Sequence, residues 1–178
     1  MANYSIRGIR DYLHRSDTAA NPDEKGKIFE DLIIYLFQKF PGVRMIDRNI
    51  LDATGSQEID VVFWNNNTLS PFYFFDPVLI SECKNEVKPL SSAKCREFVA
   101  KLRTRGANNG LLISSSGISG PSVGYRNANS VIMDALSMDR IKIIVIDRGE
   151  ILAIRNTNDL RDLIIEKYLA LTLKRAMS

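Results

Sequence analysis

The sequence predicts an α/β fold with a mixed central β-sheet and helices on both faces. Apolar residues recur at helical spacing from Ile28 to Phe40, which is typical of an amphipathic helix. Three runs rich in β-branched and aromatic residues then predict strands over Val43–Leu51, Glu58–Asn65 and Val78–Lys84. A helix between the third strand and a fourth suits a crossover onto a parallel neighbour. The expected order is therefore helix, three strands, helix and strand.

The first long helix has clear start and stop signals. Asn21 is a favourable N-cap, and Pro22 occupies the first helical position. Pro41-Gly42 ends this helix. A further helix is expected over Ser5–His14, within an N-terminal extension formed by residues 1–20.

The second half of the chain alternates between helical and strand-like segments. Pro89 separates the third strand from a basic helix, and Gly106 closes that helix. The expected elements are a helix over Ser91–Arg105, a strand over Gly110–Ser115, a helix over Ser122–Met138, a strand over Ile141–Asp147, a short strand after Arg148-Gly149 and a C-terminal helix over residues 158–176.

An aromatic run, Pro71-Phe72-Tyr73-Phe74-Phe75, stands in the connection between the second and third strands. We expect it to extend a strand and to fill part of the core. A wedge against DNA bases or a dimer contact is the alternative, because exposed aromatic clusters mark interaction surfaces.

Length and composition suit one domain, residues 1–178, with a hydrophobic core of its own. The chain is 45% hydrophobic and 25% charged, which is ordinary for a soluble protein. No stretch approaches the roughly 20 apolar residues of a membrane span. Asp11, His14 and Arg15 interrupt the N-terminus where a signal peptide needs its apolar region. We therefore expect a cytoplasmic protein without membrane contact.

The cysteine and histidine content excludes several kinds of site. Cys83 and Cys95 do not form a CxxC pair, and His14 is the only histidine. This argues against structural zinc and against a histidine-based catalytic triad. We expect both cysteines to be buried, reduced and inert. Acid–base chemistry would then depend on carboxylates, lysines or metal-bound water.

Charged residues interrupt two of the apolar strands. Asp60 lies in the second predicted strand, and Glu82 and Lys84 lie in the third. Because side chains alternate across a strand, Glu82 and Lys84 project from one face while Cys83 points the other way. If the two strands are neighbours, Asp60 can join that face. Two carboxylates beside one ammonium form a site for a hard divalent cation; a purely structural Asp–Lys–Glu network is the alternative.

Basic residues are concentrated directly after this charged strand. Residues 84–105 contain seven Lys or Arg against two Glu, a local charge of +5 in a chain whose net charge is +3. Such a stripe fits a surface that binds a polyanion, although a solvated helix face is the alternative. The candidate DNA-binding residues are Lys88, Lys94, Arg96, Lys101, Arg103 and Arg105.

The order of these motifs resembles the PD-(D/E)XK nuclease superfamily, and is most similar to its Mrr-type restriction endonuclease branch. The resemblance covers residues 25–155 and includes Asp60 and the Glu82-x-Lys84 motif. Gly26-Lys27-Ile28-Phe29-Glu30 is similar to the first-helix motif, and Gly110 to Ser116 to the strand after the basic helix.

Two positions depart from the pattern of that superfamily. Ile59 precedes Asp60 where a proline is usual, and Ser56-Gln57-Glu58 replaces the expected glycines, of which Gly55 alone is retained. The first departure is common among these divergent proteins. The second affects the local turn and the role of Glu58, which is either a contact residue or a rim residue.

The resemblance implies a restriction-endonuclease-like core and a Mg²⁺-dependent DNA endonuclease of the restriction or defence type, with Mn²⁺ as a substitute. It implies that Asp60, Glu82 and the backbone carbonyl of Cys83 bind the metal. Lys84 would orient or deprotonate the attacking water, with its pKa lowered by partial burial and metal charge. Spacing alone places Glu30 among solvated residues; the family pattern brings it to the metal site, where it would hold a metal-bound water.

Two other functions remain open at this point. One is a structure-selective nuclease such as a Holliday-junction resolvase, which shares the fold and the Glu-x-Lys motif. The other is an inactive nuclease-fold module that binds only DNA or a partner. The sequence contains no evident helix-turn-helix or zinc finger, so specificity would come from loops, a homodimer or a separate targeting protein.

Overall fold

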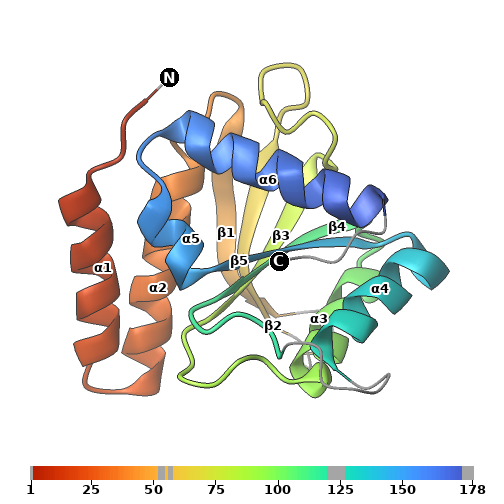
Figure 1. The fold of residues 1–178 in the computed structure, drawn as a ribbon, viewed down its shortest axis with the longest axis horizontal. Coiled ribbons are helices and arrows are strands. Elements are labelled where there is room, and N and C mark those ends of the chain that lie inside the picture. The colour runs from red at the N-terminus through yellow and green to blue at the C-terminus, as the bar shows by residue number, and fades with distance from the viewer. Residues whose placement is uncertain (1, 52–54, 56–57, 120–126, 174–178) are drawn as a thin grey trace.

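The structure is a computed structural model that describes residues 2–51, 55, 58–119 and 127–173. Figure 1 shows helices on either side of a central sheet. The elements in chain order are α1 (Ile6–Thr18), α2 (Pro22–Phe37), β1 (Val43–Leu51), β2 (Glu58–Asn65), β3 (Val78–Lys84), α3 (Ser92–Thr104), β4 (Asn109–Ser114), α4 (Ala128–Asp139), β5 (Lys142–Asp147), α5 (Arg148–Ala153) and α6 (Thr157–Thr172).

The sheet has five strands in the order β1-β2-β3-β4-β5, so each strand lies beside its neighbours in sequence. The pairs β1–β2 and β2–β3 are antiparallel, whereas β3–β4 and β4–β5 are parallel. The prediction of a mixed sheet is therefore confirmed. Helix α3 provides the expected crossover between the parallel strands β3 and β4.

The helices form separate groups around the sheet. Helices α1 and α2 pack against each other at one side, and α2 contacts β1, β2 and β3. Helices α3 and α4 pack together at the other side, and α6 crosses near β5 (Figure 1). In the described part of the chain, no helix is both long enough and apolar enough to cross a membrane.

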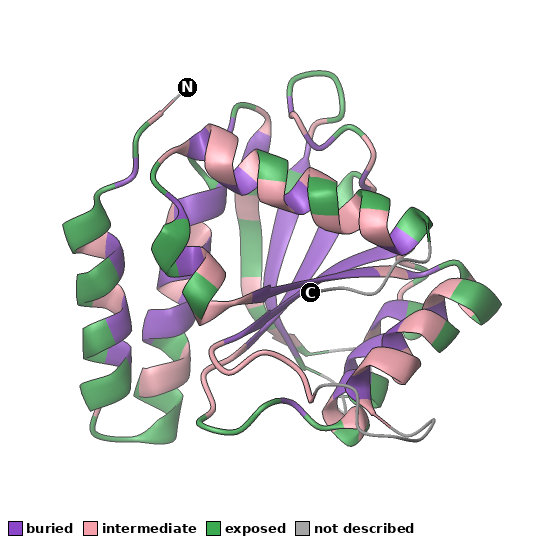
Figure 2. Cartoon of the chain, in the orientation of Figure 1, coloured by how far each residue is buried: buried purple, intermediate pink, exposed green. Residues whose placement is uncertain are grey.

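The core is built around buried strands and aromatic rings. Figure 2 shows the central strands as almost continuously buried, and every residue of β4 is buried. Phe37 on α2 contacts Phe63 on β2 with ring centroids 5.3 Å apart. These contacts join the first helical layer to the sheet at strands β2 and β3, which carry the charged motif.

The aromatic run at residues 71–75 fills the core but does not extend a strand, so that part of the prediction is wrong. Phe72 and Phe75 are buried within a loop of consecutive turns, whereas Tyr73 is 70% exposed. The Asn65 side-chain amide holds this loop by donating to the Phe72 carbonyl at 2.9 Å. A buried amide can satisfy loop carbonyls that a strand would pair through its ladder.

The segment after β5 forms a short helix, α5, instead of the predicted short strand. Asp147 accepts a hydrogen bond from the Glu150 backbone N–H at 2.9 Å, and Glu150 accepts one from the Asp147 N–H at 2.9 Å. This reciprocal capping box starts a helix immediately after the strand. The glycine at position 149 suggested a turn, but the cap determined the local structure.

Four helix boundaries differ from their predicted positions by more than one residue. Helix α2 ends at Phe37, although the helical spacing continues to Phe40. α1 continues to Thr18, beyond His14, because the buried Ser16 hydroxyl donates to the Lys25 carbonyl at 2.7 Å and holds the last turn against α2. Helix α4 begins at Ala128, and the predicted part at 122–126 lies outside the described residues. Helix α6 ends at Thr172, and positions 174–176 also lie outside them.

Candidate active site

The site lies where strands β2 and β3 separate. Their antiparallel pairing ends at Val61 and Ser81, although both strands continue beyond this point alongside their other neighbours. The Cys83 N–H donates to Asp60 Oδ2 at 2.7 Å, so a side chain replaces the backbone ladder there. The separation of the strands leaves room for charged groups between them.

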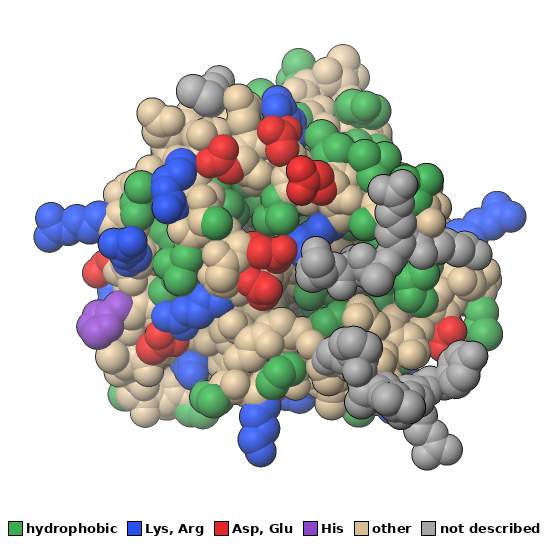
Figure 3. Space-filling model, viewed as in Figure 1, with side chains coloured by type: hydrophobic (Ala, Val, Ile, Leu, Met, Phe, Trp, Pro, Cys, Tyr) green, Lys and Arg blue, Asp and Glu red, His purple; other side chains and the backbone are tan. Residues whose placement is uncertain are grey.

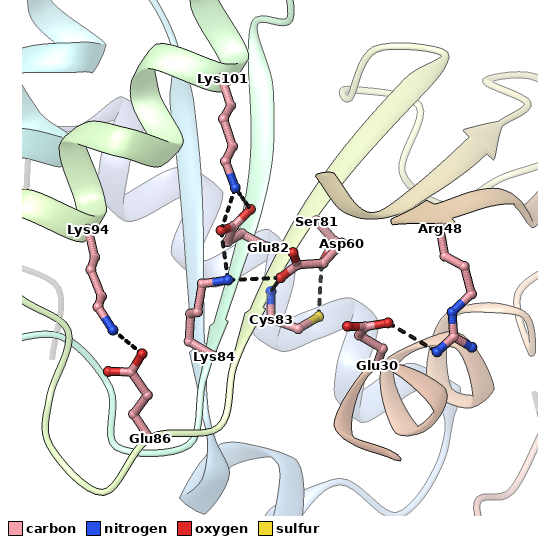
Figure 4. Close-up of polar contacts among 10 residues, drawn as sticks. All are labelled: Glu30, Arg48, Asp60, Ser81, Glu82, Cys83, Lys84, Glu86, Lys94 and Lys101. Atoms are coloured by element: carbon pink, nitrogen blue, oxygen red, sulfur yellow. Dashed lines mark hydrogen bonds and ion pairs between the residues drawn. The ribbon is translucent and has the colours of Figure 1, made fainter. Parts of the chain in front are cut away.

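The structure brings Asp60, Glu82 and Lys84 together, as the alternation of the strands predicted. Lys84 Nζ lies 3.2 Å from Asp60 Oδ2 and 2.8 Å from Glu82 Oε1 (Figure 4). Both carboxylate residues are buried, with 8% and 5% of their surfaces exposed. One ammonium therefore bridges two carboxylates at the point where the strands separate.

Lys101 also belongs to this cluster. It reaches from α3, and its Nζ lies 2.7 Å from both carboxylate oxygens of Glu82. Its side chain is only 14% exposed. The sequence placed Lys101 among outward-facing DNA contacts, but it follows the buried Phe98 by three positions and thus borders the buried stripe of its helix. The three-residue spacing from Phe98 was the feature of the sequence that could have indicated the burial of Lys101.

Glu30 is buried on α2, so the solvated position suggested by its spacing is wrong. The residue is 7% exposed, and Arg48 Nη2 on β1 lies 3.1 Å from its Oε2. Although this is an ion-pair distance, Oε2 has no hydrogen-bond partner of suitable geometry. Gly26 lies one turn earlier on this side of the helix, and a Cβ there would make only an ordinary van der Waals contact with Glu30 Oε1, at 4.0 Å.

A cavity of about 500 Å³ opens beside these residues. Helix α2 supplies one wall, and the separated ends of β2 and β3 supply another. Glu82 is absent from the described lining of this cavity, and its carboxylate contacts Lys101 on α3. The lining consists of Pro22, Asp23, Lys25, Gly26, Lys27, Glu30, Asn49, Glu58, Asp60, Cys83, Lys84, Asn85 and Glu86.

Burial and neighbouring charge perturb both acids that face the cavity. Burial raises the pKa of Asp60, and the Glu82 charge raises it further, while Lys84 and the Cys83 N–H act in the opposite direction. Burial also raises the pKa of Glu30, with an added contribution from Asp60 and an opposing one from Arg48. The surroundings of both residues therefore disfavour the ionised carboxylate. A bound cation would lower the free-energy cost of ionising them.

In the metal-free site the pKa of Lys84 is raised, whereas the expected lowering included the charge of a bound metal. Burial lowers the pKa of Lys84, but the charges of Glu82 and Asp60 and their hydrogen bonds raise it more, so the net direction is upward. The group is a firm positive charge at neutral pH in this arrangement. Its chemical contribution is therefore electrostatic stabilisation and hydrogen-bond donation.

The carboxylate and carbonyl oxygens of this site are the type of ligand that a hard divalent cation prefers. Within the described ranges, no set of three or more His, Cys, Asp and Glu side chains is placed to hold a metal ion. Mg²⁺, however, keeps several waters and needs only one or two carboxylates. The N–H and C=O of a strand residue point to the same neighbour, so the Cys83 carbonyl faces the Asp60 side. Glu30 adds a further acceptor, because its Oε1 is turned away from Arg48 and toward Cys83 (Figure 4).

Both cysteines are buried free thiols, as predicted. Burial raises the pKa of the Cys83 thiol, with a further contribution from the Asp60 charge. Burial likewise raises the pKa of Cys95 to about 11. A raised thiol pKa keeps sulfur protonated and poorly nucleophilic. The contribution of Cys83 to the site is therefore its backbone.

Several residues of the predicted basic stripe form ion pairs with acidic side chains. Lys94 forms an ion pair with Glu86, and Arg103 Nε lies 2.9 Å from Asp139 Oδ2. On the face shown in Figure 3, basic and acidic side chains are interspersed. Contact of these residues with DNA stays a prediction. Lys88 and Arg96 are exposed, and Arg105 is half-buried with Nη1 3.3 Å from the Lys101 carbonyl oxygen.

Two residues of β1 also belong to the surroundings of the site, and the sequence did not single them out. Arg48 contacts both Glu30 and Asp31, with Nη1 2.8 Å from Asp31 Oδ1. Asn49 lines the cavity and has a φ of 53°, in the left-handed region that asparagine tolerates better than most residues. An asparagine inside a predicted strand was the one available signal, because asparagine is depleted in strands.

Comparison with known families agrees with this arrangement. The Mrr_cat family model, described as a restriction endonuclease, matches residues 23–153, more than two thirds of the chain. A comparison with curated proteins returned no match. The matched segment contains all five strands and all the charged residues drawn in Figure 4. The fold is restriction-endonuclease-like, and the chain belongs to the Mrr_cat family of restriction endonucleases.

Proposed function

We propose that this protein is a Mg²⁺-dependent endonuclease that hydrolyses phosphodiester bonds in DNA, in a restriction or defence role. Membership of the family supports a nuclease in general terms. The observation that carries the finer proposal is the meeting of the Asp60 and Glu82 carboxylates on one ammonium, that of Lys84. This meeting occurs beside a cavity, where a phosphodiester could approach.

Asp60, Glu82 and the carbonyl of Cys83 would hold the metal, for which Mn²⁺ is a suitable substitute. A bound divalent ion supplies an activated water and stabilises negative charge on phosphoryl oxygens. The raised pKa of Asp60 is consistent with this assignment, because the fold keeps a buried carboxylate that a cation would stabilise.

Lys84 would donate hydrogen bonds to the attacking water or to a non-bridging oxygen of the scissile phosphate. Its carboxylate neighbours raise its pKa in the metal-free site, so it is a protonated hydrogen-bond donor when the metal arrives. A fixed positive charge there stabilises the additional negative charge of the transition state. This role depends on position and charge rather than on proton transfer.

Glu30 would act through a bound water and would not contact the phosphate itself. Its Oε2 is buried beside the cavity without a hydrogen-bond partner, and Arg48 lies 3.1 Å from it. A water in the cavity could donate to the other oxygen, Oε1, which is turned away from Arg48 (Figure 4), and be oriented by it. Arg48 would then be a positioning residue that fixes the carboxylate.

The test is cleavage of covalently closed supercoiled plasmid by the purified protein, with Mg²⁺, with Mn²⁺ and with EDTA. A closed circle has no ends, so nicking identifies an endonuclease. We expect cleavage only with metal, and a loss of at least about 100-fold in Asp60→Asn and Lys84→Met. Circular dichroism would establish that both variants are folded. Undiminished cleavage by the two folded variants would remove this site from consideration.

A further inference from the structure

We propose that Lys101 holds Glu82 away from the cavity in the metal-free protein and thereby competes with the divalent cation for this carboxylate. The inference rests on the proposed function, because it takes Glu82 as a metal ligand. It gives Lys101, on α3, a part in loading the site rather than in contacting DNA from an outward face.

The contacts of Glu82 leave little room for another cation. Lys101 Nζ lies 2.7 Å from Oε1 and 2.7 Å from Oε2, and Lys84 Nζ lies 2.8 Å from Oε1. A carboxylate offers about four lone-pair positions, so these ammonium groups use most of them. Three of these positions are taken, so a metal that binds Glu82 through both oxygens must displace at least one contact.

The direction of the contacts identifies which ammonium must leave. Figure 4 shows Lys101 reaching Glu82 from α3, on the side away from Glu30. Asp60 and Glu30 line the cavity, but Glu82 is not among the described residues that do. Turning the Glu82 carboxylate toward Asp60 would break its two contacts with Lys101. Lys84 already lies between Asp60 and Glu82, so the same movement would keep the Glu82 carboxylate near Lys84.

Burial strengthens the competition. The side chains of Lys101 and Glu82 are 14% and 7% exposed, so water screens their attraction weakly. An ammonium this close to a ligand oxygen also repels an incoming divalent cation. Lys101 hangs from a neighbouring helix by a flexible four-carbon chain, so it can withdraw without any change in the backbone of β3.

This competition lowers the apparent metal affinity by a measurable factor. When a binding-competent state is populated for a fraction of the time, the apparent dissociation constant rises by the inverse of that fraction. If Glu82 is free of Lys101 for about one tenth of the time, removal of the ammonium should tighten metal binding about tenfold. Lys101→Arg preserves the cation and its bidentate contact, so it should retain the weak binding.

The first experiment is calorimetric titration of Mn²⁺, without DNA, into the wild type, Lys101→Met, Lys101→Arg and the matched control Arg96→Met. The exposed Arg96 lies on the same helix, so this control removes one positive charge without touching Glu82. We expect Lys101→Met to bind Mn²⁺ about tenfold more tightly than the other three. Equal or weaker binding by folded Lys101→Met would overturn the inference and leave the proposed function in place.

A second measurement uses the wild type alone, in case Lys101→Met fails to fold. Lysines are acetylated with a water-soluble reagent, in the presence and in the absence of saturating Mn²⁺. The extent of acetylation at each lysine is then measured by peptide mass spectrometry. We expect acetylation of Lys101 to increase several-fold with Mn²⁺ while the exposed Lys39 is unchanged. An unchanged Lys101 in the Mn²⁺-bound protein would overturn the inference. If Mn²⁺ binds neither the wild type nor Lys101→Met, the metal-dependent function falls as well.

Discussion

Replacing Lys84 by Met should destabilise the fold as well as abolish activity, and the structure gives the size of the effect. Lys84 Nζ contacts two buried carboxylates, on Asp60 and Glu82. Removing one partner of a buried ion pair costs about 3–5 kcal/mol, because it leaves an uncompensated charge. Here the Lys84 side chain is 30% exposed, and Lys101 still neutralises Glu82. We therefore expect a loss of about 2–3 kcal/mol in the free energy of unfolding.

The assay is urea unfolding in EDTA, with thermal melting as a second measure. For a chain of this length, each kcal/mol changes the melting temperature by about 2–4 °C, so Lys84→Met should melt roughly 4–12 °C below the wild type. The exposed Lys88 supplies the control, since Lys88→Met should change the free energy by less than about 0.5 kcal/mol.

A double-mutant cycle tests the physical reason for this loss. In an Asp60→Asn background, Lys84 faces one charged carboxylate instead of two, so Lys84→Met should cost measurably less than it does in the wild type. A Lys84→Met variant as stable as the wild type would show that Lys84 does not stabilise the two buried carboxylates. An equal loss in both backgrounds would also refute this physical reason, because it would mean that Lys84 and Asp60 are not energetically coupled.

Two further predictions concern the scaffold. A Cβ on Gly110 would lie 2.7 Å from Leu102 Cδ1 and 2.8 Å from Phe98 Cζ, so Gly110→Ala should cost about 1–3 kcal/mol by overpacking in urea unfolding, and an unchanged midpoint would contradict this. A hydrogen bond from Arg148 lowers the pKa of Asp17, so this pair stabilises the fold above the unfolded pKa of the acid and ceases to do so as pH falls through the lowered folded value. The pair is surface-exposed, so Arg148→Met should lower the free energy of unfolding by at most about 1 kcal/mol at pH 7. In thermal melts at strongly acidic pH, the variant should be as stable as the wild type. A difference in stability that persists there would exclude the ionised Asp17 as its cause.

The parts of the fold that depend on local pattern could be predicted from the sequence. The first three strands have the predicted bounds, because β-branched runs between turn residues determine them locally. The meeting of Asp60 with Glu82 and Lys84 also followed from strand alternation and one assumption, that β2 and β3 are neighbours. The family match supports the nuclease fold that the motif order indicated.

The remaining features depend on tertiary contacts that no single segment encodes. Lys101 and Glu82 are 19 residues apart and meet only because α3 lies close enough to β3 for the Lys101 side chain to reach it. Arg48 reaches Glu30 from another element, so the burial of that acid could not be read from helical spacing. The protonated state of Lys84 likewise follows from the closeness of two buried carboxylates, which outweighs its desolvation.

The most direct test of a metal-dependent site at Asp60 is the conversion of supercoiled plasmid to nicked or linear DNA by the wild type and by Asp60→Asn, in Mg²⁺ and in EDTA. We expect cleavage by the wild type in Mg²⁺ alone, and none by a folded Asp60→Asn variant under either condition. Cleavage that persists in EDTA, or in the folded Asp60→Asn variant, would contradict a metal-dependent site built on Asp60, Glu82 and Lys84.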